Sequence, residues 1–322
     1  MNQLSIAPWL LAALLGGAAC EMKSEKDAPG LDSTELAARA DRFARAVAQP
    51  DSDAEAPIAL WLLPPDLNEI SGLALTADGR LLTHGDQRGH VFEIDYRRGV
   101  VVKEFAVGQP TVHGDFEAIA VVGDTTVLLG SNGTLYFFHE GANSAHVAVA
   151  AQDTKLGNEC EFEGLAYDPA IHALLLACKN IHTKSLKDAL VIYRWTHESG
   201  KSPQVSRLTV PLSRVIGSNG WKSLHPSDIT IDPLNGNYVI IASREEALIE
   251  ITATGNVVFS RPLPGEHSQA EGIAITKDSI LIISDERSVG PTAKHENRGP
   301  KDESGAITLY RWPLPRTPRE PK

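Results

Sequence analysis

The sequence of 322 residues lacks the features that several protein classes require. It contains three cysteines and 30 Lys and Arg against 41 Asp and Glu, which gives a formal net charge of −11. A nucleic-acid-binding protein usually carries a basic face, so this charge argues against one. It also argues mildly against a peripheral binder of anionic lipid. We therefore expect a soluble, acidic, globular body with no nucleic-acid partner.

Two further absences narrow the fold and the chemistry. No amphipathic helix of 10–15 residues alternates with the strand-like segments, which disfavours a parallel α/β sheet. The segment GSNG at 217–220 lacks the Gly-x-Ser-x-Gly spacing of a nucleophile elbow. Hydrophobic residues make up 42% of the chain, which suits one large domain or two ordinary ones.

The N-terminus carries an apolar run, SIAPWLLAALLGGAAC, that ends in small residues and Cys20. The run is too short, and too closely followed by charge, to span a bilayer as a stable helix. It predicts a signal peptide over 1–20 and resembles a bacterial lipoprotein signal, in which Cys20 is lipidated. The alternative is an ordinary cleaved signal peptide. We expect an exported cell-envelope lipoprotein, periplasm-facing or outer-membrane-associated, with this anchor as its one contact with the membrane.

Residues 21–56 have the composition of a tether, because their polar and Pro-rich ends cannot bury enough apolar surface to order themselves. Between those ends, Asp32 and Glu35 form a capping pair for a helix. The apolar residues of this helix fall on one face: Leu36, Ala40, Phe43 and Val47. We expect a short helix that rests on the domain or on the membrane.

The body, residues 57–316, is a repeat array, and 317–322 form a tail. Five similar phrases begin at acidic residues, and the steps between them are 48, 46, 65 and 43 residues. Propeller repeats have such periods. Each unit contains four short strand-like segments, except the last, which lacks one; IALWLL at 58–63 can supply it. The pattern predicts an all-β propeller of five four-stranded blades, closed by an N-terminal strand in the last blade. Six blades are the alternative.

Acidic residues begin the first strand of each unit, and that strand lines the channel of a propeller. The second strand returns to the same end, so two rings of oxygen ligands should surround one opening. Oxygen ligands without cysteine suit Ca²⁺ or Mg²⁺. The alternative is that these acids cap strand ends and bind nothing. The predicted metal ligands are Glu69, Glu117, Glu163, Asp228, Glu271, Asp86, Glu245 and Glu286.

Histidines and basic residues lie near the same opening. A histidine beside carboxylates can act as a general base near neutral pH, and the candidates are His113, His225 and His267. The predicted ligand rim comprises Arg88, Asn132, Lys179, Asn180, Arg244 and Arg287. A basic rim around an acidic, metal-filled centre suits a small anionic ligand. The alternatives are solvated loop histidines and ordinary exposed charges.

The remaining cysteines, Cys160 and Cys178, are symmetric about residue 169, where Asp168-Pro169 turns a hairpin. They should therefore face each other on adjacent antiparallel strands. We predict a disulfide between them, as is reasonable in an exported protein.

Three segments, CEFEGLAYDP, QAEGIAIT and LIISDE, resemble the SdiA-regulated (YjiK-like) family of bacterial β-propellers. The resemblance extends from about Leu67 to Trp312. It implies a secreted or membrane-associated propeller and makes a metal in the channel plausible. Esterase-like-phytase propellers and calcium-dependent lactonase propellers are more distantly similar.

Two functions remain open from the sequence. The first is a binding module, expected to be monomeric, that holds a divalent cation and binds a small anionic ligand or an envelope protein. The second is a metal-dependent hydrolase of phosphoesters, esters or lactones, in which the ion polarises the substrate and activates water. A closed metal site would favour the first, and an open coordination position beside a proton acceptor would favour the second.

Overall fold

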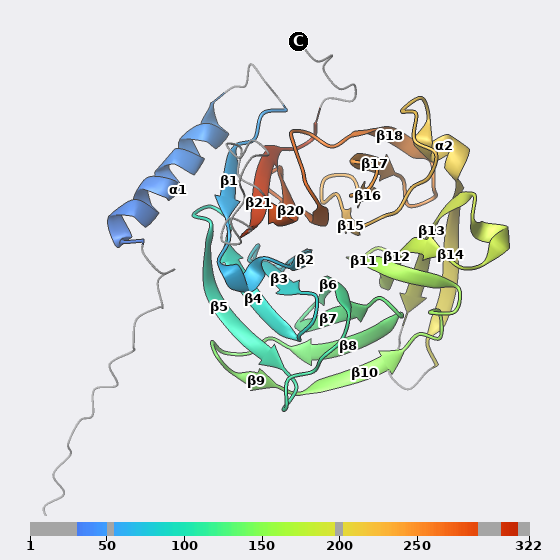
Figure 1. Cartoon of the computed structure of the whole chain (residues 1–322), viewed down its shortest axis with the longest axis horizontal. Coiled ribbons are helices and arrows are strands. Elements are labelled where there is room, and N and C mark those ends of the chain that lie inside the picture. Colours follow the sequence, from blue (N-terminus) through green and yellow to red (C-terminus); the bar gives the residue numbers. More distant parts are fainter. Residues whose placement is uncertain (1–30, 50–54, 197–201, 289–303, 315–322) are drawn as a thin grey trace, which may run out of the picture.

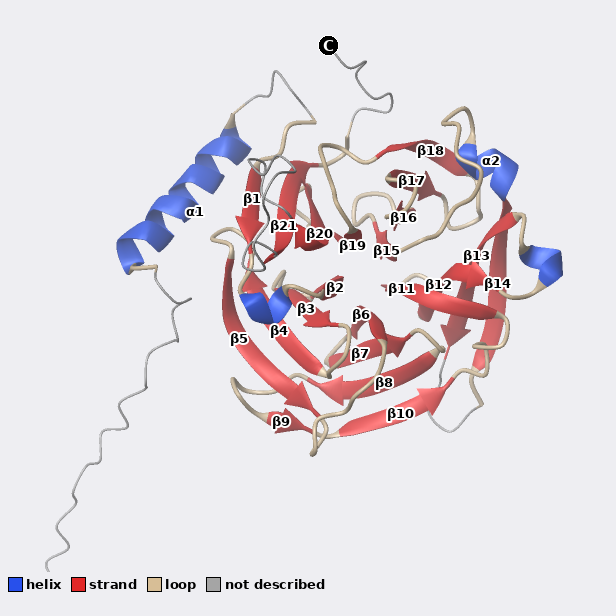
Figure 2. Cartoon of the chain, in the orientation of Figure 1, coloured by secondary structure: helices blue, strands red, loops and turns tan. Residues whose placement is uncertain are grey.

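The computed structural model describes residues 31–49, 55–196, 202–288 and 304–314. Within these residues, five antiparallel sheets are arranged around a common centre (Figure 1), and strands account for most of the regular structure (Figure 2). These five sheets confirm the predicted five-bladed propeller. The predicted signal peptide, Cys20 and the tail at 317–322 lie outside the described residues.

Each blade runs outward from the centre in chain order. The inner strands are β2 (Ile70–Leu75), β6 (Phe116–Val122), β11 (Cys160–Asp168), β15 (Asp228–Ile231) and β19 (Ala270–Ile275). The second strands are β3 (Leu81–Gly85), β7 (Thr125–Gly130), β12 (Ala173–Ile181), β16 (Tyr238–Ala242) and β20 (Ile280–Ser288). The third strands are β4 (His90–Asp95), β8 (Thr134–His139), β13 (Ala189–Thr196), β17 (Ala247–Ile251) and β21 (Ser304–Arg311).

The outer strands lie at the perimeter of the ring in Figure 1. They are β5 (Val100–Val107), β10 (Val149–Asp153), β14 (Gln204–Pro211), β18 (Val257–Pro262) and β1 (Ala59–Leu62). A short strand, β9 (His146–Val147), adds to β5 in parallel. The N-terminal β1 pairs with β21, with Ala59 opposite Leu309. This pairing gives the last blade its fourth strand and closes the ring as predicted.

Apolar side chains fill the spaces between neighbouring blades. Phe162 and Leu176 of the third blade pack against Leu129 of the second, and all three are buried. Between the fifth and first blades, Ile282 packs with Ile70. Each such side chain contributes about 1.5–3 kcal/mol when it leaves water. The alternation of these apolar residues along the strands therefore holds the five blades in a ring.

Short helices decorate this ring. Helix α1 (Ser33–Ala48) begins at Asp32, whose Oδ1 accepts a hydrogen bond from Glu35 N at 2.8 Å. Its Phe43 is buried against Tyr96, so the helix rests on the propeller. The other helices are η1 (Pro65–Leu67), η2 (Lys184–Leu186) and α2 (Leu212–Ile216). Among the described helices, none has the length and apolar character needed to cross a membrane.

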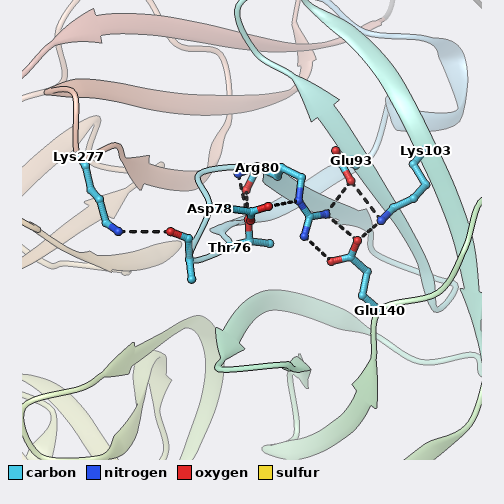
Figure 3. Close-up of polar contacts among 8 residues, drawn as sticks. Thr76, Asp78, Arg80, Glu93, Lys103, Glu140 and Lys277 are labelled. Carbon is cyan, nitrogen blue, oxygen red and sulfur yellow. Dashed lines mark hydrogen bonds and ion pairs between the residues drawn. The ribbon is translucent and has the colours of Figure 1, made fainter.

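The turns that follow the inner strands carry an ionic network (Figure 3). Arg80 Nη1 lies 2.9 Å from Glu93 Oε2 and 2.6 Å from Glu140 Oε1, and Lys103 contacts both carboxylates. Lys277 Nζ donates to the carbonyl oxygen of Ala77 at 3.3 Å. These contacts join the first blade to the second and the fifth.

A disulfide joins Cys160 on β11 to Cys178 on β12, with a Cα–Cα distance of 5.7 Å. The two cysteines do not face each other directly, contrary to the symmetric hairpin expected from the sequence. Cys160 pairs with Ile181, and Cys178 pairs with Phe162. Irregularities on both sides of Phe162 change the register, and nothing in the sequence marks them.

Candidate functional site

The strand registers determine which residues of the five blades are equivalent. Leu73, Ile119, Leu165, Ile229 and Ile273 occupy the same position, since they pair with Thr83, Leu128, Leu176, Ile240 and Ile283 of the second strands. Two residues before this position stand three glutamates and two serines: Ser71, Glu117, Glu163, Ser227 and Glu271. The sequence-based alignment of Glu69 and Asp228 with these glutamates is therefore wrong.

The second strands show a similar shift. Three residues beyond the shared position of these strands stand Asp86, Ser131, Lys179, Ser243 and Glu286. Asp86 and Glu286 occupy the equivalent register position, and their role as metal ligands stays a prediction. Asn132 and Asn180 lie one residue further on, and Glu245 lies two residues further on. Lys179, which was expected on the rim, occupies one of these five equivalent positions.

Glu117, Glu163, Glu271 and Lys179 form one electrostatic cluster, which we call the acidic mouth. The ammonium group of Lys179 donates a hydrogen bond to Glu163 Oε1. Lys179 also interacts electrostatically with Glu117 and Glu271. Glu163 is buried, and its two companion glutamates are partly buried. Three blades therefore supply the carboxylates, and β12 supplies the cation between them.

Burial raises the pKa of all three glutamates. The pKa of Glu117 rises to about 8, through burial and then through the charges of Glu163 and Asp115. Burial raises the pKa of Glu163 to about 7, although Lys179 opposes the rise. The pKa of Glu271 rises to about 7 for the same reasons. The cluster therefore exchanges protons near neutral pH.

Lys179 stays charged in this setting. Its burial works against the charge, but the hydrogen bond to Glu163 and the charges of Glu271 and Glu117 prevail and raise its pKa. Its side chain is 29% exposed, against 5% for Glu163. The lysine is thus an internal cation with a route to solvent.

Glu69 and Asp86 belong to a neighbouring hollow rather than to the acidic mouth. They line a cavity of about 550 Å³ beside η1, together with Arg88 and Asp66. Burial and the charge of Glu69 raise the pKa of Asp86. Gln87 Nε2 donates to Glu69 Oε2 at 3.2 Å. This hollow contains acid and base side by side.

Glu245 lies in a separate cluster with His225. Its Oε1 is 2.7 Å from His225 Nδ1 and accepts from Ser223 Oγ at 3.0 Å. Arg244 Nη1 is 3.1 Å from His225 Nε2. Because a guanidinium group can only donate, His225 Nε2 accepts and Nδ1 donates to Glu245. Burial opposes this arrangement, yet the hydrogen bonds from His225 hold the pKa of Glu245 below its ordinary value.

The other two histidines have different surroundings. His267 has a side chain only 1% exposed, with Nδ1 2.6 Å from Asp285 Oδ2 and Nε2 3.0 Å from the hydroxyl of Tyr310. His113 is exposed and forms an isolated β-bridge with Arg88. A catalytic role for these histidines or for His225 stays a prediction.

The remaining rim residues have local partners where they are described. Asn180 Nδ2 donates to Glu161 Oε2 at 2.8 Å, and Asn132 Oδ1 accepts from Thr134 N at 2.9 Å. Gln269 Nε2 donates to Glu286, whose charge raises the pKa of Glu271. The side chain of Arg287 lies outside the described residues.

Asp228 lies apart from the glutamates and is completely buried, 1% exposed. Its two oxygens accept backbone hydrogen bonds from Ile229 and Ile273. Sequence reasoning missed this role, although the signal was present: an aspartate stands where three other blades have glycine and one has alanine.

The acidic mouth offers a metal ion the carboxylate oxygens of three glutamates. The ammonium group of Lys179, however, lies among these oxygens. Within the part of the chain that the structure describes, no three His, Cys, Asp or Glu side chains are already arranged to hold a metal. A site for Ca²⁺ or Mg²⁺ would require the ammonium group of Lys179 to leave Glu163. Metal binding stays a prediction.

Comparison with known protein families gives a match over part of the chain. The sequence pattern of the SdiA-regulated family matches residues 218–294, which include the segments QAEGIAIT and LIISDE. No curated protein sequence matches the chain.

Several solved structures are similar to the propeller. One is the glutaminyl cyclase of Myxococcus xanthus, with 14% identity over 79% of this chain and 94% of that chain, and a TM-score of 0.49. Another is a luciferin-regenerating enzyme, with 9% identity over 80% of this chain and 97% of that one, and a TM-score of 0.48. A third is the PQQ-bound aldose sugar dehydrogenase of Streptomyces coelicolor, with 12% identity over 79% and 99% of the two chains, and a TM-score of 0.45.

Proposed function

Since this chain is a β-propeller of the SdiA-regulated family, we propose that it is an exported binding module whose acidic mouth takes up a divalent cation, Ca²⁺ or Mg²⁺. The convergence of Glu117, Glu163 and Glu271 around Lys179 carries the proposal. When all four groups are charged, three carboxylates and one ammonium group leave two negative charges. A divalent cation balances that charge.

Uptake of the cation is coupled to the loss of protons. At neutral pH the three glutamates are partly protonated, because their pKa values lie at about 7 to 8. A cation binds carboxylates only in their ionised form, so binding releases protons and becomes stronger as the pH rises. The ammonium group of Lys179 would turn outward through its exposed side.

A bound cation would then hold a small anionic ligand or an envelope protein at the opening. Arg88 and Arg244 are the rim residues whose charge suits such a partner. The disulfide between Cys160 and Cys178 supports an oxidising compartment, and thus export. A lipid anchor at Cys20 completes the proposal of a monomeric cell-envelope lipoprotein.

We favour a binding module over a metal-dependent hydrolase because two of the three candidate histidines, His225 and His267, have no ring nitrogen left to accept a proton from water. A hydrolase needs a proton acceptor beside an open coordination position. Both ring nitrogens of His225 and of His267 are already engaged in hydrogen bonds.

Calorimetric titration with Ca²⁺ and with Mg²⁺ tests the proposal. The purified protein should bind one ion, and Glu163→Gln and Glu271→Gln should each weaken binding at least about tenfold while the fold remains intact. Glu159→Gln is a matched control just before the same strand, since its carboxylate contacts Tyr193 and Arg207. Unchanged affinity in both mouth variants, or no binding by the parent protein, would refute the site.

A further inference from the structure

Asp228 is held at the centre of the ring by backbone groups of several blades. Its Oδ1 accepts the N–H of Ile229 at 2.8 Å, and its Oδ2 accepts the N–H of Ile273 at 2.9 Å. Burial raises the pKa of Asp228 well above its ordinary value, and the backbone N–H groups of Leu165 and Leu73, like those of Ile229 and Ile273, oppose that rise by stabilising the charged form. The four donors belong to β2, β11, β15 and β19. One side chain thus links four inner strands.

The strand geometry explains why these donors are available. An inner strand is an edge strand, so every second residue points an unpaired N–H toward the axis. Leu73, Leu165, Ile229 and Ile273 are equivalent in register, and therefore their N–H groups point inward at one level. Without an acceptor, each buried N–H group would lose the hydrogen bond that water provides in the unfolded chain, which destabilises the folded state.

Small residues leave space for this arrangement. The positions equivalent to Asp228 hold glycine or alanine in the other blades: Gly72, Ala118, Gly164 and Gly272. A Cβ on Gly72 would lie 2.8 Å from Ala118 Cα, and one on Gly272 would lie 2.7 Å from the carbonyl oxygen of Ser71. The inner strands approach too closely at these points for a side chain, and the fourth blade supplies the carboxylate.

We propose that the inward-pointing N–H groups form an anion-binding ring at the hub of the propeller, and that the carboxylate of Asp228 fills this ring as a built-in ligand. The ring would accept a small monovalent anion, such as formate, once the carboxylate is removed. Converging backbone N–H groups bind anions elsewhere in proteins, and their hydrogen bonds to a carboxylate are stronger than those to a neutral acceptor.

Asp228 also lies between two different regions along the propeller axis. The residues that follow the ring, among them Leu75, Val121 and Tyr167, line a cavity of about 160 Å³. The acidic mouth lies on the other side, two residues before the ring in each strand. Asp228 is therefore a structural anion between the two and not a ligand of the proposed cation.

Removal of the side chain tests the proposal. In the full-length protein, Asp228→Gly should lower the melting temperature by about 5 °C or more. Sodium formate at about 100 mM should then raise the melting temperature of this variant by about 3 °C or more. Sulfate at equal ionic strength should have a smaller effect, because it is too large for the ring. Crystals of the variant grown in bromide should show an ion at the hub.

Two controls separate this effect from a general influence of salt. The parent protein and Asp124→Gly, which alters an exposed side chain in the turn between β6 and β7, should not gain stability from formate over sulfate. An equal response of all three proteins to formate would overturn the proposal. A melting temperature of Asp228→Gly equal to that of the parent would do the same.

A second variant gives an answer even if Asp228→Gly does not fold. Asp228→Asn keeps the shape but places an NH₂ donor against a ring of donors. It should fold with a lower melting temperature than the parent at pH 5 to 8. Equal melting temperatures for Asp228→Asn and the parent over this range would show that no anion is needed at the hub.

Discussion

The ammonium group of Lys179 hydrogen-bonds to Glu163 inside the acidic mouth, at the point where Glu117 and Glu271 also act on it. The positive charge of Lys179 therefore neutralises part of the negative charge that the glutamates of three blades bring together. This relationship makes the opening of the propeller a coupled set of titrating groups rather than a row of separate surface acids.

The raised pKa of Glu117 predicts how stability depends on pH. Glu117 holds its proton up to about pH 8 in the folded protein, but only to its ordinary value of 4.5 in the unfolded chain. The folded state thus binds more protons between these values, so its stability falls as the pH rises from about 4.5 through about 8.

Glu117→Gln removes this contribution. In urea titrations without divalent cations, the free energy of unfolding of the parent protein should fall between pH 5 and pH 8.5. It should fall by about 1–3 kcal/mol more than that of the variant. Equal losses in the two proteins would show that Glu117 titrates normally.

Replacement of Lys179 tests the balance of charge in the mouth. Lys179 lowers the pKa of Glu163 through its hydrogen bond and charge. In Lys179→Met the pKa of Glu163 should therefore rise by about one unit or more, as followed by NMR of the carboxyl carbon. Lys155→Met, which removes an exposed lysine paired with Asp153, should leave it unchanged. A Glu163 pKa that does not respond to Lys179→Met contradicts the described geometry.

The disulfide should stabilise the third blade. It closes a loop with a sequence separation of 18 residues between β11 and β12. Replacing Cys160 and Cys178 by alanine should lower the free energy of unfolding by about 2–4 kcal/mol, mainly because the unfolded chain gains freedom. Urea titrations of both proteins measure this difference. A reducing agent should destabilise the parent protein and have no effect on the double variant.

The ionic network in Figure 3 should stabilise the face opposite the mouth. Arg80 contacts three carboxylates, of which Glu93 and Glu140 also bind Lys103. Arg80→Met should cost about 1–2 kcal/mol at low salt and less at high salt, because exposed parts of the network are screened. Arg97→Met, which removes a longer and more exposed contact with Asp278, should cost less than about 0.5 kcal/mol.

The architecture could be predicted from the sequence because it depends on repetition. The regular return of the phrases at Glu117, Glu163 and Glu271 indicated the blades, and IALWLL indicated the strand that closes the ring. Both signals arise from burial of alternating side chains, which a sequence displays directly.

The detail of the site depended on register, which the sequence does not display. Four inner strands have irregular pairing just before or within the repeated phrase, and β15 does not. Alignment by the first acid therefore misplaced Glu69 and Asp228, whereas alignment by the following leucine or isoleucine would have placed both. A one-residue shift moves a side chain to the other face of a strand, and Asp228 lies at the hub for this reason.

Proton release on cation binding tests the account most directly. Calorimetric titration of the full-length protein with Ca²⁺ at pH 7, repeated in buffers of different ionisation enthalpy, measures this quantity. The account predicts that about one proton or more is released for each ion bound, and that the release disappears at pH 9.5, where the glutamates are already ionised. Binding without proton release at pH 7, or no binding at either pH, would contradict it.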